Sequence, residues 1–380
     1  MRLLKRFFIL GLAMPLTLAP MAPGGTFLKQ RQRGGNVKSR TFTWLTVVTS
    51  ACLALVLLAA GLAYATFPGQ NGRISFARFL PDTNSFSIFS VRPDGFGEQQ
   101  LTFDAPNHAS LVSDWSPDGS HIAFDSDRFS NNVDDLVDIF TMNADGSGCC
   151  VQLTTHAGFN GEPEYSRDGN TIVFESDRGL GSAGEGIYLM NASDGTIVRR
   201  VTVTPAAFFD AFPHFSPTGT RIVFTRSLNS CRPNRGGTGP RGCLAAVFLV
   251  NADGSGLTRI TPWGHDTGAT DWSPDGSKLV LQSRLETPLG SKTDVLVVNV
   301  DGSNLVDLTS NPPRTGGPCS ISERATFSPD GTKLVFGHTE CNGRPTLWIM
   351  NADGSGKQDT GIPLGIFNVE GFADWGTNQN

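Results

Sequence analysis

The sequence lacks the short motifs that mark several large classes of enzyme. It has no Gly-x-Ser-x-Gly nucleophile elbow, no His-Glu-x-x-His zinc motif and no glycine-rich phosphate loop. Its seven cysteines form no Cys-x-x-Cys pair, which argues against a cysteine-ligated metal. Serine and zinc hydrolases and phosphate-loop enzymes are therefore disfavoured, and we expect no cofactor.

Acidic residues are absent from the first 65 positions, which contain eight lysines and arginines. The remaining residues include 22 basic and 35 acidic ones, a formal charge of −13 that disfavours nucleic acid as a partner. Within the acid-free region, residues 44–65 are uncharged and mostly apolar, and are long enough to span a bilayer. The basic residues just before this segment orient its N-terminal side toward the cytoplasm, so the rest of the chain is predicted to be extracytoplasmic.

Two interpretations of residues 44–65 remain open. Ala-Tyr-Ala at residues 63–65 fits a small-x-small cleavage site, which favours a signal peptide, whereas an uncleaved segment would be a transmembrane anchor. The basic N-terminal region, residues 1–43, contains a second apolar stretch. This stretch is too short to span a bilayer and is interrupted by proline. We hypothesise that translation starts at Val37, which leaves an ordinary export signal. N-terminal sequencing of the native protein that found residues 1–36 would contradict this hypothesis.

The stretch Asn-Ala-Asp-Gly-Ser-Gly occurs three times, and its spacing matches the first half of an EF-hand calcium loop. The copies start at Asn143, Asn251 and Asn351. A calcium loop also needs a bidentate Glu at position 12, where these copies have Thr154, Pro262 and Ile362. β-Branched and aromatic residues precede each copy, as in strands, and Asp-Gly supplies the backbone angles of a tight turn. We therefore predict hairpins rather than calcium loops.

Asp-Gly turns of this kind recur at a period of about fifty residues. They begin at Asp94, Asp145, Asp194, Asp253, Asp301 and Asp353. An aromatic residue followed by Ser-Pro-Asp-Gly, or a close variant, and then an apolar run precedes each of the last five. These signatures begin at Trp115, Tyr165, Phe215, Trp272 and Phe327. Most turns are followed by Leu-Thr or an equivalent, so each repeat reads as four antiparallel strands, here called a to d, as in a propeller blade.

The two ends of the repeat region predict how the ring closes. Residues 71–79 form a strand b with no strand a before it, whereas residues 373–376 resemble a strand a with no strand b after it. Closure of the ring leaves no open sheet edge, so we expect the C-terminal strand to become the innermost strand of the first blade. The sequence therefore predicts an all-β fold, a six-bladed propeller of four-stranded antiparallel blades over residues 68–376, followed by a tail at 377–380.

The repeated Trp-Ser-Pro-Asp-Gly-Ser pattern, followed by Asn-Ala-Asp-Gly-Ser-Gly and Leu-Thr, resembles the TolB-like β-propellers, which are relatives of the WD-repeat propellers. The resemblance covers residues 68–376 and implies the propeller fold. Similar proteins include the periplasmic TolB component of a cell-envelope complex and the propeller domains of some peptidases. The shared residues are scaffold in all of them, so the resemblance implies no particular activity.

Six of the seven cysteines lie outside the apolar segment, and an even number suits disulfides in an oxidising compartment. One candidate pair flanks a Gly-, Pro- and Arg-rich insertion, and the other is expected to meet at one rim of the ring. The pairs are Cys231 with Cys243 and Cys319 with Cys341. The adjacent Cys149 and Cys150 point to opposite faces of a strand, so they are either free or bridged to each other.

In this strand order the d-to-a and b-to-c loops share one rim, and loops on a rigid scaffold often carry function. The ligand-binding candidates are polar residues of the d-to-a loops and those directly before the strand-a aromatic residues. They are His108, Asp114, His156, Glu164, Asp210, His214, His265, Asp266, Asp271 and Asp374. The acids before the aromatic residues form either a polar ring at the channel mouth or ion pairs with the arginines that end strand b. We expect ion pairs with these arginines, Arg128, Arg178, Arg226 and Arg284.

Three histidines, His108, His156 and His265, lie in equivalent loops and could together hold Zn, Cu, Fe or Ni. Solvated loop histidines are the simpler alternative, so we predict no metal. The expected function is an exported monomer that binds a protein or cell-envelope partner through the rim without catalysis. The alternative is a propeller lyase or hydrolase that acts on an extracellular glycan with these histidines and the channel acids.

Overall fold

The computed structural model describes most of the chain after residue 68, and all of the described strands belong to the unit Gly61–Asn380. The described residues are 69–130, 136–155, 158–178, 184–231, 244–264, 266–287, 290–311, 321–340, 343–365 and 373–378. Several predictions fall outside them: the segments 1–43 and 44–65, both proposed disulfide pairs, and the loop histidines His156 and His265. The side chain of Asp266 also lies outside the described part of the structure. No helix among the described residues is long and apolar enough to cross a bilayer.

Four separate sheets each contain four antiparallel strands, and we call each of them a blade. The first blade has the order β24 (Ala373–Thr377), β1 (Asn71–Leu80), β2 (Ser85–Val91), β3 (Gln99–Gln100). The second has β4 (Ser110–Trp115), β5 (His121–Ser126), β6 (Asp138–Asn143), β7 (Val151–Gln152). The third has β8 (Asn160–Tyr165), β9 (Thr171–Ser176), β10 (Gly186–Asn191), β11 (Ile197–Arg200). The fourth has β12 (Phe208–Phe215), β13 (Arg221–Leu228), β14 (Ala245–Asn251), β15 (Thr258–Arg259), with the short 3-10 helix η3 (Asn229–Cys231) after β13.

The remaining strands form one eight-stranded sheet, so the structure shows four separate blades where the sequence predicts six. One half contains β16 (Asp266–Trp272), β17 (Lys278–Thr287), β18 (Gly290–Asn299) and β19 (Val306–Asp307). The other contains β20 (Ile321–Phe327), β21 (Lys333–Thr339), β22 (Thr346–Asn351) and β23 (Gln358–Pro363). Pairing is antiparallel inside each half, and one parallel pairing of Thr293 with Ile321 joins them. Thr293 is the fourth residue of the ten-residue strand β18.

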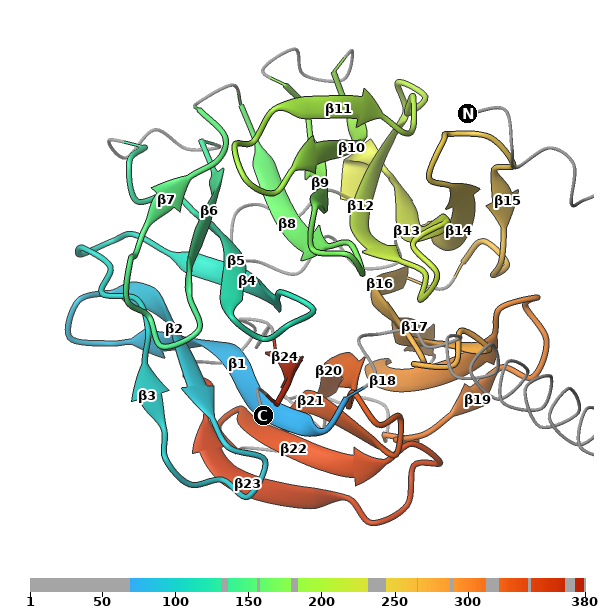
Figure 1. Cartoon of the computed structure of the whole chain (residues 1–380). Coiled ribbons are helices and arrows are strands. Elements are labelled where there is room, and N and C mark those ends of the chain that lie inside the picture. Colours follow the sequence, from blue (N-terminus) through green and yellow to red (C-terminus); the bar gives the residue numbers. More distant parts are fainter. Residues whose placement is uncertain are drawn as a thin grey trace, which may run out of the picture. The chain divides into compact units, whose positions relative to one another are not determined.

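The C-terminal strand closes the first blade, as the sequence predicts. β24 pairs antiparallel with β1, with Ile74 opposite Trp375 and Phe76 opposite Ala373. Figure 1 shows the sheets arranged around a common centre, with β4, β8, β12, β16, β20 and β24 as the inner strands. Consecutive inner strands contact one another, including β24 with both β4 and β20. The residues that precede the strand-a aromatic residues are therefore brought to the centre of the ring.

The Asp-Gly motifs are hairpin turns held by their own side chains. The Asp145 carboxylate accepts a hydrogen bond of 2.8 Å from the backbone N–H of Ser147, and Asn143 Nδ2 donates to Ser147 Oγ at 2.9 Å. The copies at 251–256 and 351–356 make the same bonds. The preference for turns over calcium loops is therefore confirmed. In the third blade Gly195 has φ +70°, and a Cβ there would overlap the carbonyl oxygen of Leu153 in the second blade.

The threonine of the Leu-Thr motif connects strand d to strand c through its side chain. In five repeats its Oγ1 accepts a hydrogen bond from a backbone N–H of strand c. The pairs are Ile88 with Thr102, Ile139 with Thr154, Ile187 with Thr202, Val247 with Thr261 and Val295 with Thr309, at 2.9–3.1 Å. The two-residue outer strands β3, β7, β15 and β19 make few ladder bonds, so this side-chain bond adds to their attachment.

The core lies between the faces of neighbouring blades. The apolar residue at the centre of each strand b is almost fully buried, as the repeat predicts: Phe76, Phe124, Phe174, Phe224, Leu281 and Phe336 are 0–1% exposed. One cluster joins Ile88 and Leu101 of the first blade to Trp115, Phe124 and Phe140 of the second. Removing one of these side chains would therefore weaken contacts that hold two blades together.

We predict that Phe174→Ala lowers the free energy of unfolding by about 3–5 kcal/mol, because it leaves a cavity in the buried core between two blades. Phe174 is 0% exposed, and its ring lies 5.9 Å from that of Tyr188. The measurement is denaturant unfolding of the variant beside Val198→Ala, whose side chain belongs to the same blade and is 56% exposed. Equal stability of the two variants would contradict the burial of Phe174.

Candidate functional site

The candidate site is the set of polar side chains at the centre of the ring. Each of its acids directly precedes a buried aromatic residue, and side chains alternate along a strand, so the acid points to the centre while the aromatic residue points into the core. Four carboxylates each accept a hydrogen bond from a backbone N–H of the next inner strand. The bonds are Trp115 N to Asp374 Oδ2 (3.0 Å), Tyr165 N to Asp114 Oδ2 (2.7 Å), Phe215 N to Glu164 Oε2, and Phe327 N to Asp271 Oδ2 (2.8 Å).

The two remaining junctions between inner strands use different groups. Trp272 Nε1 donates to the carbonyl oxygen of His214 at 3.3 Å, which connects β12 with β16. Thr326 Oγ1 donates to the carbonyl oxygen of Ala373 at 3.0 Å, which connects β20 with β24. Hydrogen bonds at or next to the position before the aromatic residue therefore continue around the whole ring of inner strands.

The predicted partners of these acids are wrong in two cases that the structure describes. Arg128 forms its ion pair with Asp104 of the loop between β3 and β4, at 3.0 Å, rather than with Asp114. Arg226 pairs with Asp210 rather than with a residue next to the aromatic position. The arginines lie at the rim end of strand b, whereas the acids lie at the centre and face the next blade. A structural role for the acids is thus supported, but through backbone N–H groups.

Burial strongly affects the ionisation of this ring. It raises the pKa of Asp271 to about 7 and that of Asp374 to about 6, and nearby Glu164 acts in the same direction. Burial also raises the pKa of Asp114 well above its usual value, with Asp374 as the largest charged contributor. For His214, burial alone would lower the pKa, but the Glu164 carboxylate at 3.5 Å raises it to about 9. The ring therefore takes up protons near neutral pH.

A second layer of polar residues lies at the β-bulges of the inner strands, and the sequence analysis missed it. Glu162, Phe212 and Arg324 have φ of 56°, 54° and 49°, a region that residues other than glycine rarely adopt. Asp125 Oδ2 accepts from Glu162 N at 3.1 Å, Glu162 Oε2 accepts from Phe212 N at 2.5 Å, and the Arg324 guanidinium lies 4.5 Å from the Phe212 ring centre. A proline after Glu162 and after Phe212 is the one signal of irregular strands that the sequence offers.

Asp210 does not face the centre as predicted, because it belongs to a buried ion pair inside the fourth blade. Its carboxylate is 0% exposed and accepts hydrogen bonds from Arg226 Nε (2.6 Å) and Nη2 (2.7 Å). Thr202 and Thr204 also donate to Asp210 Oδ2, at 2.8 and 2.6 Å. Both carboxylate oxygens are therefore engaged within the protein, which supports a structural role for Asp210.

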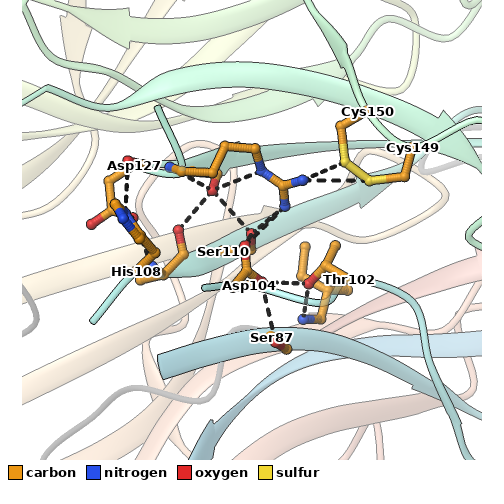
Figure 2. A network of polar contacts seen from close by, with 12 residues as sticks. Ser87, Thr102, Asp104, His108, Ser110, Asp127, Cys149 and Cys150 are labelled. Atoms are coloured by element: carbon orange, nitrogen blue, oxygen red, sulfur yellow. Dashed lines mark hydrogen bonds and ion pairs between the residues drawn. A yellow bond between two sulfur atoms is a disulfide. The ribbon is translucent and has the colours of Figure 1, made fainter. Parts of the chain in front are cut away.

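His108 is also engaged by the protein. Its Nδ1 lies 3.1 Å from the carbonyl oxygen of Asp127 and 3.3 Å from the Asp127 carboxylate (Figure 2). The convergence of His108 with His156 and His265 falls outside the described residues. Within the described ranges no group of three His, Cys, Asp or Glu side chains could hold a metal ion. The described part of the site therefore offers hydrogen bonding and proton uptake.

Comparison with known proteins identifies the fold of this ring. Residues 98–235 match the model of the TolB beta propeller domain. TolB from Acinetobacter baumannii superposes with a TM-score of 0.61 and 22% identity, over 81% of this chain and 67% of that one. The putative TolB from Agrobacterium tumefaciens superposes with a TM-score of 0.53 and 17% identity, over 81% of this chain and 98% of that one. Kuenenia stuttgartiensis hydrazine synthase superposes with a TM-score of 0.55 and 15% identity, over 81% of this chain and 47% of that one.

These identities are below the level at which a shared fold implies shared activity, and a propeller scaffold serves many functions. The family model covers the second blade, the third blade and parts of their neighbours, which are among the repeats that carry the quoted motifs. The similar structures extend the likeness over about four fifths of the chain. Residues 98–235 thus match the TolB beta propeller domain, and the described strands form a propeller similar in fold to the TolB structures.

Proposed function

We propose that this protein is a non-catalytic binding scaffold, which contacts a protein partner through the rim formed by the d-to-a and b-to-c loops. The observation that carries the proposal is the exposure of large apolar side chains on these loops. Phe103 is 80% exposed in the loop before β4, Phe129 is 50% exposed in the loop after β5, and Val203 is 77% exposed in the loop before β12. Exposed aromatic residues are typical anchors of protein interfaces.

Two of these anchors belong to one place on the rim. Asp104 and Arg128 form an ion pair at 3.0 Å, and Phe103 and Phe129 are their neighbours along the chain. The junction of the first and second blades therefore carries both rings beside a partly buried charge pair. We propose this junction as the centre of the contact surface.

The central acids support a scaffold rather than an enzyme. Asp114, Glu164, Asp271 and Asp374 each hold a backbone N–H of the next inner strand, which is a structural use of the carboxylate. The glycan lyase or hydrolase alternative needs these acids and the loop histidines, and His108 bonds to Asp127. No observation on the described residues favours that alternative.

The proposal includes the architecture and the location of the protein. We infer that each half of the eight-stranded sheet acts as a blade, which makes six blades over residues 68–376, because pairing inside each half is antiparallel. We also propose that the propeller is extracytoplasmic and monomeric. The proposed location rests on the basic-then-apolar segment before residue 66 and on the acidic charge of the remainder.

Site-specific photocrosslinking in the native host tests the contact surface. A photoreactive phenylalanine analogue at position 103 or 129 is expected to give the same discrete protein adduct. The matched control is position 257, because Leu257 is 48% exposed but follows the c-to-d turn, at the opposite end of the strands. Adducts of equal yield at all three positions, or none at 103 and 129, would contradict the proposal.

A further inference from the structure

The second blade carries a pair of adjacent cysteines that the proposed function does not use. Cys149 and Cys150 precede β7 and are joined by a disulfide. Cys149 is exposed, whereas Cys150 is half-buried and packs against the cluster that contains Phe124 and Phe140. The two sulfurs therefore differ in access: an external reagent reaches Cys149 more readily than Cys150.

A single guanidinium lies against both sulfurs. Arg128 Nη1 is 3.5 Å from Cys149 Sγ and 2.5 Å from Cys150 Sγ (Figure 2). Its position is fixed from the other side, because Nη2 donates to Asp104 Oδ1 and Ser110 Oγ, each at 3.0 Å. The guanidinium also lies above the Phe124 and Phe140 rings, at 5.1 and 5.3 Å from their centres. The positive charge is thus held at the sulfurs by contacts that do not depend on them.

This arrangement matches what thiol–disulfide exchange requires. The attacking thiolate must reach one sulfur, and the other sulfur must leave as a thiolate, which a neighbouring guanidinium stabilises. Cys149 provides the accessible sulfur, and Cys150 lies closer to Arg128. No other described residue pair in the ring combines two sulfurs with a partly buried arginine.

We propose that Cys149 and Cys150 form a redox-active pair, with Cys149 attacked by an external dithiol and Cys150 released as a thiolate beside Arg128. The first step forms a mixed disulfide between the reagent and Cys149 and breaks the bond to Cys150. The second thiol of the reagent, after losing its proton, then attacks the mixed disulfide and releases Cys149. The reagent leaves as a disulfide, two electrons pass to the cysteines, and the two protons of the reagent go to the cysteine sulfurs or to solvent.

The test uses the full chain, reduced with dithiothreitol at pH 7 and then alkylated with iodoacetamide for increasing times. Trypsin cuts after Arg167 and leaves these two cysteines on a peptide with no others, so fragmentation in mass spectrometry follows each thiol separately. We expect reduction of the pair in the folded chain. We also expect alkylation of Cys150 to be about tenfold slower in Arg128→Met than in the unchanged chain, because the variant lacks the charge that stabilises the thiolate.

A second variant keeps the test informative if Arg128→Met fails to fold. Asp104→Asn retains Arg128 and removes the carboxylate that partly neutralises it, so Cys150 is expected to react at least as fast as in the unchanged chain. Three results would overturn the proposal: a pair that resists reduction in the folded protein, an unchanged rate in a folded Arg128→Met chain, or slower alkylation in Asp104→Asn. None of these readouts depends on the partner proposed for the rim.

Discussion

Acidification from pH 8 to pH 5.5 is expected to raise the free energy of unfolding of this propeller by several kcal/mol. Burial raises the pKa of Asp125 and Asp374 to about 6 and that of Asp271 to about 7. A carboxyl group whose pKa is higher in the folded state stabilises the fold when protonated, and this contribution is lost as the pH rises through the folded-state pKa. A pKa that lies one pH unit higher in the folded than in the unfolded chain corresponds to about 1.4 kcal/mol.

His214 acts in the same direction. The Glu164 carboxylate outweighs burial and raises the pKa of this histidine to about 9, so its stabilising contribution is complete below about pH 6.5 and is lost as the pH rises through 9. The exposed turn aspartates have the opposite behaviour, because hydrogen bonds lower the pKa of residues such as Asp353. Their contribution disappears only at pH values below the window from 5.5 to 8. The maximum of stability is therefore expected near the acidic end of this window.

Denaturant unfolding of the full chain at intervals between pH 5.5 and 8 measures this dependence. In Asp271→Asn the slope should become shallower, since one proton-binding group of the folded state is removed. Asp353→Asn is the control, because that carboxyl group is ionised throughout the window and should leave the slope unchanged. A stability that is constant or rises between pH 5.5 and 8 would show that the central acids are solvated rather than buried.

Arg226→Met is expected to lower the free energy of unfolding by about 3–5 kcal/mol, because it leaves the Asp210 carboxylate buried without its cation. Asp210 is 0% exposed and Arg226 is 8% exposed, and two short hydrogen bonds join them. The methionine retains most of the packing on the Phe224 and Phe248 rings, above which the guanidinium lies. The loss therefore reports mainly on the uncompensated charge.

Two comparisons separate charge from packing in this experiment. The double variant Asp210→Leu with Arg226→Met removes both charges and should recover part of the lost stability. Arg92→Met breaks an ion pair whose side chains are 54% and 56% exposed, and it should leave the unfolding midpoint unchanged within error. If Arg226→Met were no more destabilising than Arg92→Met, the pair with Asp210 would not be buried in solution.

The repeats made the strand order and ring closure predictable, because each motif sets a local structure. Asp145 fixes a turn through the N–H of Ser147, and Thr102 fixes strand d through the N–H of Ile88. Such bonds join residues close in sequence, so spacing alone reveals them. The join between β18 and β20 was not predictable, because it depends on how far one strand extends toward the next repeat.

The partners of the central residues were less accessible to sequence reasoning. Asp114 accepts a hydrogen bond from Tyr165 N, a backbone group that the side-chain sequence does not reveal. An arginine at a recurring position is, by contrast, an obvious candidate for an ion pair with an acid. The left-handed backbone of Glu162 and Phe212 lies at β-bulges. The alternation of polar and apolar residues does not predict these bulges. Sequence patterns thus identified the acids at the centre of the ring but not the backbone N–H groups to which they bond.

The position of β24 has a consequence for how the protein is made. Asp374 bonds to Trp115, a residue that precedes it by 259 positions, and β24 completes the sheet begun by β1. A ribosome synthesises the chain from β1 onward, so the first blade stays without its innermost strand until every other blade has been translated. During that interval the edge of β1 is open to pairing with other chains. Premature stop codons just before residue 373 should therefore give aggregating products rather than shorter propellers.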